Sequence, residues 1–399
     1  MNVLVVGSGA AGGTVARELS KNGISVTIIE KGPATKVKNA YMEYIIQNVG
    51  TELSNTVCLG GTTLVTLGNG VKDCADDFKD FGIDLNPEFE EIERELFVSH
   101  LPDSHFGDGT KKIMESAESI GFEVEKMPKF IDPNLCKPCG KCALGCPQDA
   151  KWTSMTFIEE AEKYGAKVIE NTPVTDIIVS EGKVRGVKSY EEIFEADIVI
   201  LAAGAIETPR LLQKIGINAG HNLFVDTFVT VGGILENIKF NTELQMNAII
   251  KFDNFIIGPH FTEVLVNDLN VHNARKKDVI GLMVMIKDES SGKVTPDEII
   301  KLNTGNDLAR LAQGSAIASS ILIEAGVDPK TIVSTHARGA HLGGTAPIGD
   351  VVNKNLQTEV EGLYVGDASV FPKAPGAPPV LTIIALAKRL ANHVMEMNL

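Results

Sequence analysis

The sequence predicts an α/β fold in two parts: a parallel sheet flanked by helices, and a second, mostly antiparallel sheet. In residues 2–30 an apolar run, a glycine turn, a helical pattern and another apolar run follow one another, which is the order of a βαβ unit. Strand-then-helix patterns return at 196–217 and 363–395, so the parallel sheet is expected to be discontinuous in sequence. Between 218 and 289 apolar stretches are separated by polar residues, which indicates antiparallel strands.

These patterns predict the domain boundaries. We expect residues 1–75, 150–217 and 331–399 to form the discontinuous domain, and residues 218–330 to form the antiparallel domain. Residues 76–149 connect them and end in a Pro-, Gly- and Lys-rich stretch that contains four cysteines. A chain of 399 residues with 44% hydrophobic composition can bury the cores of two such domains.

Composition and charge exclude several classes of partner. Lys and Arg number 37 against 52 Asp and Glu, which gives a net charge of -15, so neither nucleic acid nor an anionic membrane is an expected partner. We find no run of apolar residues long enough to span a bilayer. The apolar N-terminus runs directly into a glycine turn that needs it as a strand, so a signal peptide is not expected and the predicted localisation is cytoplasmic.

The glycine turn has the spacing of a dinucleotide-binding motif. Gly7, Gly9 and Gly12 form GxGxxG directly after the first strand, and the acidic Glu30 ends the second strand. Glycines let a pyrophosphate approach the N-terminus of the following helix, and an acid about 20 residues later can accept hydrogen bonds from a ribose. The motif alone leaves NAD and FAD open.

Four further motifs favour FAD over NAD, because they resemble those of a known family. They are "LGGTTLVTLGNGV" (59–71), "ADIVILAAGAIETPRLLQKIGI" (196–217), "HLGGTAPIG" (341–349) and "GLYVGDASVFPKAPGAPPVLTIIALAKRLA" (362–391). With the N-terminus, their order and spacing resemble the glucose-methanol-choline (GMC) family of FAD-dependent oxidoreductases. The resemblance implies a Rossmann-like FAD-binding domain joined to a substrate domain like that of p-hydroxybenzoate hydroxylase, here shorter than in typical members.

The resemblance also implies which residues hold FAD. The first glycine motif and its acid would bind the ADP half, the 59–71 segment would lie beside the flavin, and the later strand ends would meet the ribityl and pyrophosphate groups. The implied cofactor-binding residues are Gly7, Gly9, Ala10, Gly12, Glu30, Lys31, Gly60, Gly61, Thr62, Val174, Ala203, Gly204, Gly366, Asp367 and Ala368. For Asp367 the residues themselves leave a helix N-cap or turn role open.

Oxidation of an alcohol requires a base near neutral pH, and imidazole is the commonest such group. The histidine that opens HxxGTxxMG faces the flavin in the family, and His341 has that position here. His336, five residues earlier, is the alternative base, and a structural role for His341 is also open. His260 and His272 fall in the predicted antiparallel sheet, where a histidine is more often a satisfied group than a functional one.

The sequence lacks the second polar residue that accompanies this histidine in the family. A second His or Asn is expected near the start of the last helix, where this chain has Pro378 and Pro379, and proline side chains neither donate nor accept hydrogen bonds. Asn69 and Thr66 in the flavin-side segment are the predicted substitutes, although both residue types are also common in turns.

The cysteines predict a metal site. Their spacing is CxxCxxCxxxCP, which matches iron-sulfur ferredoxins, and the predicted ligands are Cys136, Cys139, Cys142 and Cys146. We expect a [4Fe-4S] cluster, or a [3Fe-4S] cluster if the fourth ligand is missing; Cys58 and Cys74 are alternatives for that position. Zinc is the competing ion. A metal-free loop stays open as well, because members similar to cholesterol oxidase have a related cysteine stretch.

The predicted activity is FAD-dependent dehydrogenation of a CH-OH group in an alcohol, sugar or hydroxy acid. Electrons would leave through the cluster to a protein acceptor, such as a ferredoxin or another redox subunit. The first alternative reverses the flow, so that the cluster feeds a flavin that reduces a carbonyl or an alkene. The second is an electron-transfer subunit of a larger complex.

Overall fold

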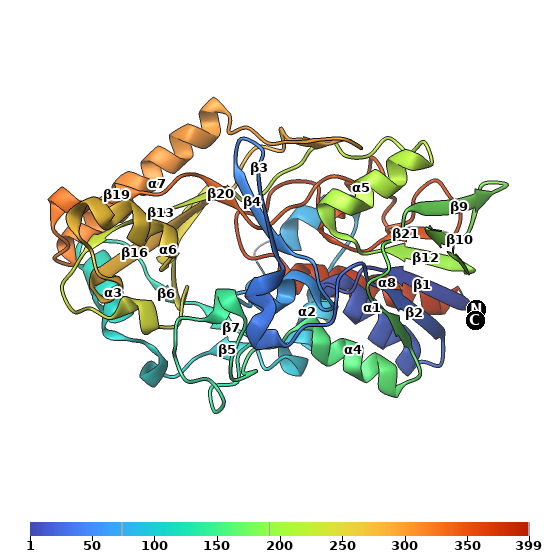
Figure 1. Ribbon diagram of the computed structural model, residues 1–399, viewed down its shortest axis with the longest axis horizontal. Coiled ribbons are helices and arrows are strands. Elements are labelled where there is room, and N and C mark those ends of the chain that lie inside the picture. Colours follow the sequence, from blue (N-terminus) through green and yellow to red (C-terminus); the bar gives the residue numbers. More distant parts are fainter. Residues whose placement is uncertain (73–74, 191, 398–399) are drawn as a thin grey trace.

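A parallel five-stranded sheet forms one half of the computed structural model, which describes residues 1–72, 75–190 and 192–397 (Figure 1). The strand order is β21-β12-β1-β2-β8. The strands are β1 (Asn2–Val6), β2 (Ser25–Ile29), β8 (Lys167–Ile169), β12 (Ile198–Leu201) and β21 (Leu363–Val365). Since β1 pairs with β12 on one side and with β2 on the other, three separated parts of the chain build this sheet, as predicted.

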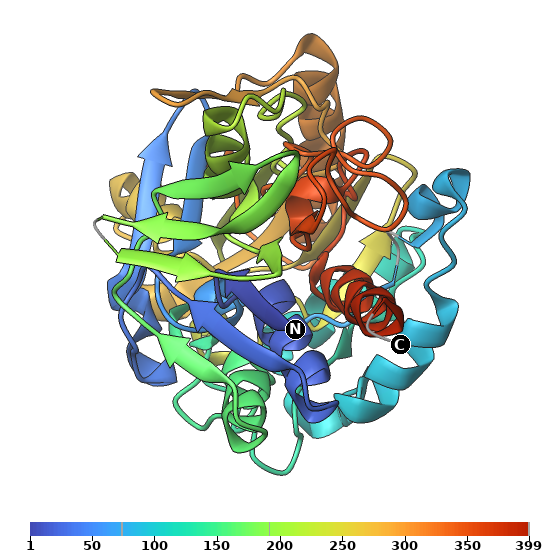
Figure 2. The same cartoon turned by 90° about the vertical axis from the view of Figure 1, so that its right-hand side faces the viewer.

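Helices and a small sheet cover the parallel sheet. Helices α1 (Ala10–Lys21), α4 (Ser154–Lys163) and α8 (Val380–Glu396) pack together, and α2 (Asn86–Glu95) packs on α8. Elsewhere a three-stranded sheet lies against the parallel sheet, where its middle strand contacts β12 (Figure 2); α5 (Gly204–Lys214) packs beside it. The strands of the small sheet are β9 (Asp176–Ser180), β10 (Lys183–Ser189) and β11 (Glu192–Glu195).

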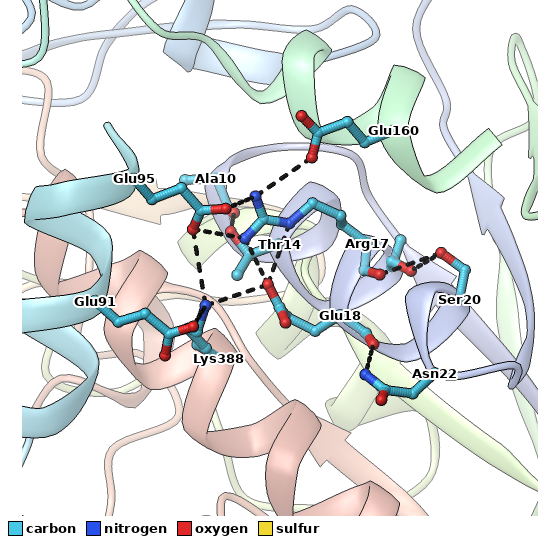
Figure 3. A network of polar contacts seen from close by, with 11 residues as sticks. Ala10, Thr14, Arg17, Glu18, Ser20, Asn22, Glu91, Glu95, Glu160 and Lys388 are labelled. Atoms are coloured by element: carbon cyan, nitrogen blue, oxygen red, sulfur yellow. Dashed lines mark hydrogen bonds and ion pairs between the residues drawn. The ribbon is translucent and has the colours of Figure 1, made fainter. Parts of the chain in front are cut away.

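An ionic network joins the helices on this side (Figure 3). The Arg17 guanidinium of α1 is buried, lies 3.5 Å from the centre of the Phe157 ring, and pairs with Glu18 and Glu95. Lys388 of α8 is also buried and donates to Glu18 at 3.3 Å. Buried cations are tolerated when carboxylates surround them. Ion pairs therefore hold helices α1, α2 and α8 together at an interface that is only partly apolar.

The second sheet has the strand order β3-β4-β20-β13-β16-β15-β14-β6, with β19 also paired to β13. All of its pairings are antiparallel except that of β4 with β20. The strands are β3 (Tyr44–Asn48), β4 (Glu52–Thr56), β6 (Glu125–Lys126), β13 (Phe228–Ile234), β14 (Ala248–Lys251), β15 (Phe255–Pro259), β16 (Val279–Ile286), β19 (Val333–Ser334) and β20 (Arg338–Gly339). Short pairs are formed by β5 (Ser99–His100) with β7 (Pro128–Lys129), and by β17 (Lys293–Val294) with β18 (Ile299–Ile300).

Strand β16 shows how this sheet is buried. All eight residues are buried, because both faces of the strand are covered. Leu282 and Val284 belong to an apolar cluster with α7 (Gly305–Glu324), whereas Met283 and Met285 point to the other face. Successive side chains of a strand point to opposite faces. A strand buried on one face would alternate apolar and polar residues, whereas β16, buried on both faces, is apolar throughout. The remaining helices are α3 (Asp108–Ser119) and α6 (Glu263–Asp268).

The predicted fold class is confirmed: a discontinuous parallel-sheet part and a mostly antiparallel part are both present. Strand pairing does cross the predicted boundaries, since β3, β4 and β20 lie in segments 1–75 and 331–399 but pair within the second sheet. The domain boundaries stay a prediction. In the described part of the chain, every helix is too short or too polar to cross a bilayer.

Candidate functional site

A cavity of about 1180 Å³ lies between the two halves of the molecule. One end is formed where β1, β2 and β12 terminate, since Val6, Ile29 and Ala202 all line it. Carboxyl ends of parallel strands meet at one edge of a sheet, which is where such folds bind nucleotide cofactors. The other end is lined by the face of the antiparallel sheet that carries Met283 and Met285.

The glycine turn after β1 is shaped by steric limits. Gly7 has φ +99°, a backbone conformation that side chains disfavour, and a Cβ on Gly12 would lie 2.0 Å from the Gly7 carbonyl oxygen. Helix α1 starts next to this turn with no side-chain cap and no acidic residue in its first turn. Its free N–H groups therefore face the cavity end with a partial positive charge, and this arrangement fits a pyrophosphate.

Glu30 lies at the end of β2 and is held by three donors. Its carboxylate accepts from the Ser8 amide at 3.0 Å, the Ser8 hydroxyl at 2.6 Å and the Gly32 amide at 2.8 Å. Burial nevertheless raises the pKa of Glu30. The same Ser8 hydroxyl accepts from the Gly60 amide at 2.9 Å, so Ser8, which the sequence patterns did not single out, joins two predicted FAD-binding segments.

Most predicted cofactor-binding residues line this cavity. They are Gly7, Gly9, Ala10, Glu30, Lys31, Gly61, Thr62, Val174, Ala203, Gly204, Asp367 and Ala368. Gly12, Gly60 and Gly366 do not line it and serve the backbone around it instead: Gly12 admits the Gly7 turn, Gly60 donates to Ser8, and the Gly366 amide donates to the Leu201 carbonyl. The residues present at this end therefore fit FAD.

Asp367 has the capping role that the sequence left open. Its carboxylate accepts from the Ser369 amide at 2.9 Å, and its other oxygen accepts from the Gly204 amide at 2.8 Å and the Thr208 hydroxyl at 2.7 Å. Asp367 thus connects the end of β21 to the start of α5, both at the edge of the cavity. Direct contact of this carboxylate with the ribityl chain stays a prediction.

His341 lines the cavity and is paired with a residue that the sequence patterns missed. Its Nδ1 lies 3.1 Å from Asp226 Oδ2, while Asp226 Oδ1 accepts from the Gly376 amide at 2.8 Å. The Asp226 side chain is fully buried, and burial raises the pKa of Asp226 to about 6. A carboxylate at Nδ1 retains the proton there, so the lone pair of His341 is on Nε2.

The backbone at Asp226 is held in an unusual conformation. Its φ is +48°, which is uncommon for a residue other than glycine. Asp288 accepts from the Val225 and Asp226 amides and is paired with Lys301 at 2.7 Å, where both charged side chains are completely buried. This ion pair positions the carboxylate that contacts His341.

The other predicted catalytic residues either lie outside the cavity or contact a lysine. His336 is half exposed, outside the cavity, with its Nε2 3.1 Å from Glu52. Asn69 and Thr66 both line the cavity, but the side-chain Oδ1 of Asn69 accepts from Lys129 Nζ at 2.5 Å and the backbone carbonyl of Thr66 accepts from Lys151 Nζ. Pro378 and Pro379 also line it.

The four clustered cysteines share a second, very small cavity. Cys136, Cys139, Cys142 and Cys146 all line it, and Cys139 also borders the large cavity. Gln148 Oε1 lies 3.9 Å from the Cys139 sulfur and 3.8 Å from the Cys146 sulfur. Burial raises the pKa of Cys136 to about 12 and raises that of Cys142, so without a metal these two thiols stay protonated at neutral pH.

The thiols are nevertheless not arranged as a metal site. In the described ranges, which omit 73–74, 191 and 398–399, no group of three or more His, Cys, Asp or Glu is placed to hold an ion. The geometry therefore supports neither the predicted cluster nor zinc. Cys58 is buried in a separate apolar cluster. Cys74, the other alternative ligand, lies outside the described residues.

Two buried lysines lie beside the thiols. Lys129 Nζ donates to the Leu67 carbonyl at 3.0 Å, to Asn69, and to the Gln245 carbonyl at 2.9 Å. Lys151 Nζ donates to the carbonyls of Thr66 and Cys142. These partners are neutral, and burial lowers the pKa of Lys129 to about 7 and that of Lys151 to about 8.

Comparison with known proteins agrees with this architecture. Residues 1–237 and 288–387 match the N- and C-terminal family models of the GMC oxidoreductases. The chain is 35% identical to an uncharacterised protein of Methanocaldococcus jannaschii over 98% of this chain and 99% of that protein. It is 23% identical to a long-chain-alcohol oxidase of Arabidopsis thaliana over 99% of this chain and 68% of that one.

Among solved structures, pyridoxine 4-oxidase from Mesorbium loti aligns with a TM-score of 0.75 at 15% identity, over 99% of both chains. This likeness shows the fold. The family models name GMC oxidoreductases as a whole, so the predicted iron-sulfur branch is not confirmed. The predicted resemblance to the family is confirmed: the chain belongs to the GMC oxidoreductases, which are FAD enzymes.

Proposed function

We propose that this protein oxidises a CH-OH group with FAD, and that Nε2 of His341 accepts the hydroxyl proton. The observation that carries the proposal is the pair of His341 and Asp226 at the cavity, 3.1 Å apart, with the imidazole partly exposed and the carboxylate fully buried. The names of two similar proteins, a long-chain-alcohol oxidase and pyridoxine 4-oxidase, support this substrate class.

The bond changes define what the residues must do. The O–H and C–H bonds of the alcohol break and a C=O bond forms; the proton goes to His341 Nε2. Bound FAD supplies the acceptor for the hydride with its electron pair. Asp226 keeps the proton of His341 on Nδ1 and stabilises the imidazolium that forms, because its negative charge lies within hydrogen-bond distance.

Reduction of the bound flavin tests this proposal directly. FAD-loaded protein is mixed anaerobically with long-chain alcohols, sugars and hydroxy acids, and loss of flavin absorbance and the carbonyl product are measured. His341→Gln should slow the bleaching by about 10²- to 10⁴-fold, the usual contribution of a general base. His336→Gln is the matched control, since His336 lies outside the cavity.

The alternative functions give different results in this assay. If alcohols leave the flavin oxidised while a carbonyl or alkene reoxidises chemically reduced flavin, the direction of the reaction is opposite to the one proposed. If neither class reacts but a partner protein exchanges electrons with the flavin, the chain is a relay subunit. An unchanged rate in His341→Gln would assign the base to another residue.

For the electron acceptor, we propose that the four clustered thiols ligate an iron-sulfur cluster. Support comes from the CxxCxxCxxxCP spacing and from Lys129 and Lys151, two buried lysines next to the thiols whose hydrogen-bond partners among the described residues are neutral. A thiolate-ligated cluster is anionic and would compensate both charges. When bound, such a cluster would accept electrons one at a time and could pass them to a protein acceptor such as a ferredoxin.

Metal content tests this part independently of turnover. Protein purified anaerobically should contain iron and acid-labile sulfide, and Cys139→Ser should reduce both, whereas Cys58→Ser should not. The sulfur of Cys58 belongs to another cluster of side chains, which makes it a matched control. Stoichiometric zinc with no iron, or metal-free protein that takes up neither on anaerobic reconstitution, would contradict the proposal and leave the oxidation proposal untouched.

A further inference from the structure

Arg338, which contacts no carboxylate in the described ranges of the chain, lines the large cavity. Arg338 is on β20 and pairs across the sheet with Phe228 of β13, whose ring centre lies 4.9 Å from the guanidinium carbon. Its Nη1 donates to the Thr262 hydroxyl at 3.2 Å and its Nη2 donates to the Thr230 hydroxyl at 3.1 Å. Its Nε is buried and has no hydrogen-bond partner among the described residues.

The charge of Arg338 is not neutralised nearby. Among described residues no carboxylate forms an ion pair with it. Glu52 and Asp268 act on its charge only from a distance, without a hydrogen bond to the guanidinium, and Glu52 contacts His336 at 3.1 Å. Glu263, which lines the same cavity, pairs with Lys276 at 2.7 Å. A guanidinium stays charged at any physiological pH, and a partly buried charge without a counter-ion is costly.

His260 adds a neutral donor beside this charge. It is buried, lines the cavity, and has Nδ1 2.9 Å from the Thr230 hydroxyl oxygen. That oxygen already accepts from Arg338, so its single proton goes to Nδ1, and the proton of the neutral imidazole is on Nε2. Burial, followed by the Arg338 charge, lowers the pKa of His260 to about 3, which keeps this ring neutral.

Much of the cavity wall beside these donors is apolar. Phe228, Met246, Phe261, Met283 and Met285 line the cavity, together with the ion pair of Glu263 and Lys276. A ligand with an apolar body and one anionic end matches such a surface. The subsite has one uncompensated positive charge, since Lys276 is already paired, and this charge favours a singly charged carboxylate over a doubly charged phosphate ester.

We infer that Arg338, with His260 and Thr262, binds a carboxylate of the substrate, so that the alcohol oxidised beside His341 is a hydroxy acid with an apolar chain. This inference rests on the oxidation proposed above and specifies its substrate class. The planar guanidinium donates two parallel hydrogen bonds to a carboxylate, a geometry that a neutral alcohol cannot use.

Matched substrates test the inference on FAD-loaded protein. Flavin bleaching is compared for 2-, 3- and 8-hydroxyoctanoate against 2-octanol, 3-octanol and 1-octanol. At least one acid should react about 10-fold or more faster than its matched alcohol. Arg338→Gln should slow that acid by about 30-fold and leave the alcohols within about twofold. Arg338→Lys should restore part of the rate, and Arg185→Gln on β10 should change nothing.

Binding measurements separate this inference from the proposed oxidation. Octanoate should perturb the flavin spectrum, octanamide should not, and Arg338→Gln should abolish the octanoate effect. If no hydroxyl compound reduces the flavin but octanoate still binds through Arg338, the subsite stands and the oxidation is wrong.

Equal rates for acids and alcohols, or an equal loss of both in Arg338→Gln, would overturn the subsite. Tighter binding of octyl phosphate than of octanoate would overturn the carboxylate assignment. If Arg338→Gln does not fold, octanoate against octanamide in the unmodified protein and in Arg338→Lys decides the question.

Discussion

Replacing Asp226 by Asn tests the central pair of the site. In the unmodified protein the Gly376 amide donates to Asp226 Oδ1 at 2.8 Å. Asn has the same shape as Asp, so its side-chain oxygen can still accept this hydrogen bond. Its NH₂ group then faces His341 Nδ1 and has to donate, which moves the imidazole proton to Nε2. The lone pair needed for the hydroxyl proton is lost from the cavity side, and the rate should fall by about 10²- to 10⁴-fold.

Stability should not follow this loss. Burial raises the pKa of Asp226 from 3.8 to about 6, a shift that disfavours the ionised form by about 3 kcal/mol. Asn removes this penalty and weakens one hydrogen bond worth about 1–2 kcal/mol. The free energy of unfolding at pH 7 should therefore stay equal or increase, which separates a role in positioning His341 from a role in folding.

Activity should also depend on pH in a defined direction. Asp226 takes up a proton as the pH falls through about 6, so the rate of flavin reduction should decline below that pH, and this decline should be missing in Asp226→Asn. The assay is anaerobic stopped-flow bleaching of the flavin from pH 5 to pH 9, with urea unfolding in parallel. A variant with an unchanged rate and pH profile would refute the proposed role of Asp226.

Three further predictions concern the frame of the site. Gly12→Ala should prevent folding or FAD binding, because its Cβ would lie 2.0 Å from the Gly7 carbonyl oxygen. A Cβ on Gly9 would meet nothing within 4 Å. Gly9→Ala should therefore keep the melting temperature of the FAD-free protein and lose only affinity for FAD, which a titration would measure. Lys301→Met should lower the free energy of unfolding by about 3–5 kcal/mol in urea titrations, because it leaves Asp288 buried and unpaired; no change would mean that the pair is dispensable. Burial lowers the pKa of Lys129 from 10.5 to about 7, so in metal-free protein the unfolded chain holds more protons between these values and stability should rise with pH across that window. Lys129→Met should reduce this rise, and an identical pH dependence in the variant would contradict the assignment.

Local motifs predicted which residues meet at one end of the cavity. Gly7, Gly9 and Gly12 follow β1 within a few residues, and Glu30 ends the next strand. A strand, a tight turn and a helix that follow directly determine their own geometry, so spacing alone is informative here. The supporting hydrogen bond from Gly60 to Ser8 joins residues 52 positions apart and has no local signal.

The contact between His341 and Asp226 shows why the rest could not be predicted. Asp226 and His341 are 115 residues apart. Asp226 lies in an apolar stretch whose pattern predicts a strand and nothing about catalysis. Its left-handed backbone depends on Asp288 and Lys301, which come from later segments. The sequence also left His336 as an alternative base, and only the fold shows it at the surface with Glu52.

The sequence by itself determined the cofactor class, the order of the two sheets and the spacing of the cysteines, because these depend on neighbouring residues and on apolar periodicity. Only the tertiary structure decided which acid contacts His341, that Arg338 Nε is buried without a hydrogen-bond partner among the described residues, and that the four thiols share a cavity that is not arranged as a metal site in the described part of the chain. Each of these depends on distances between segments that are far apart in the chain. Burial and charge pairing exist only once those segments have packed together.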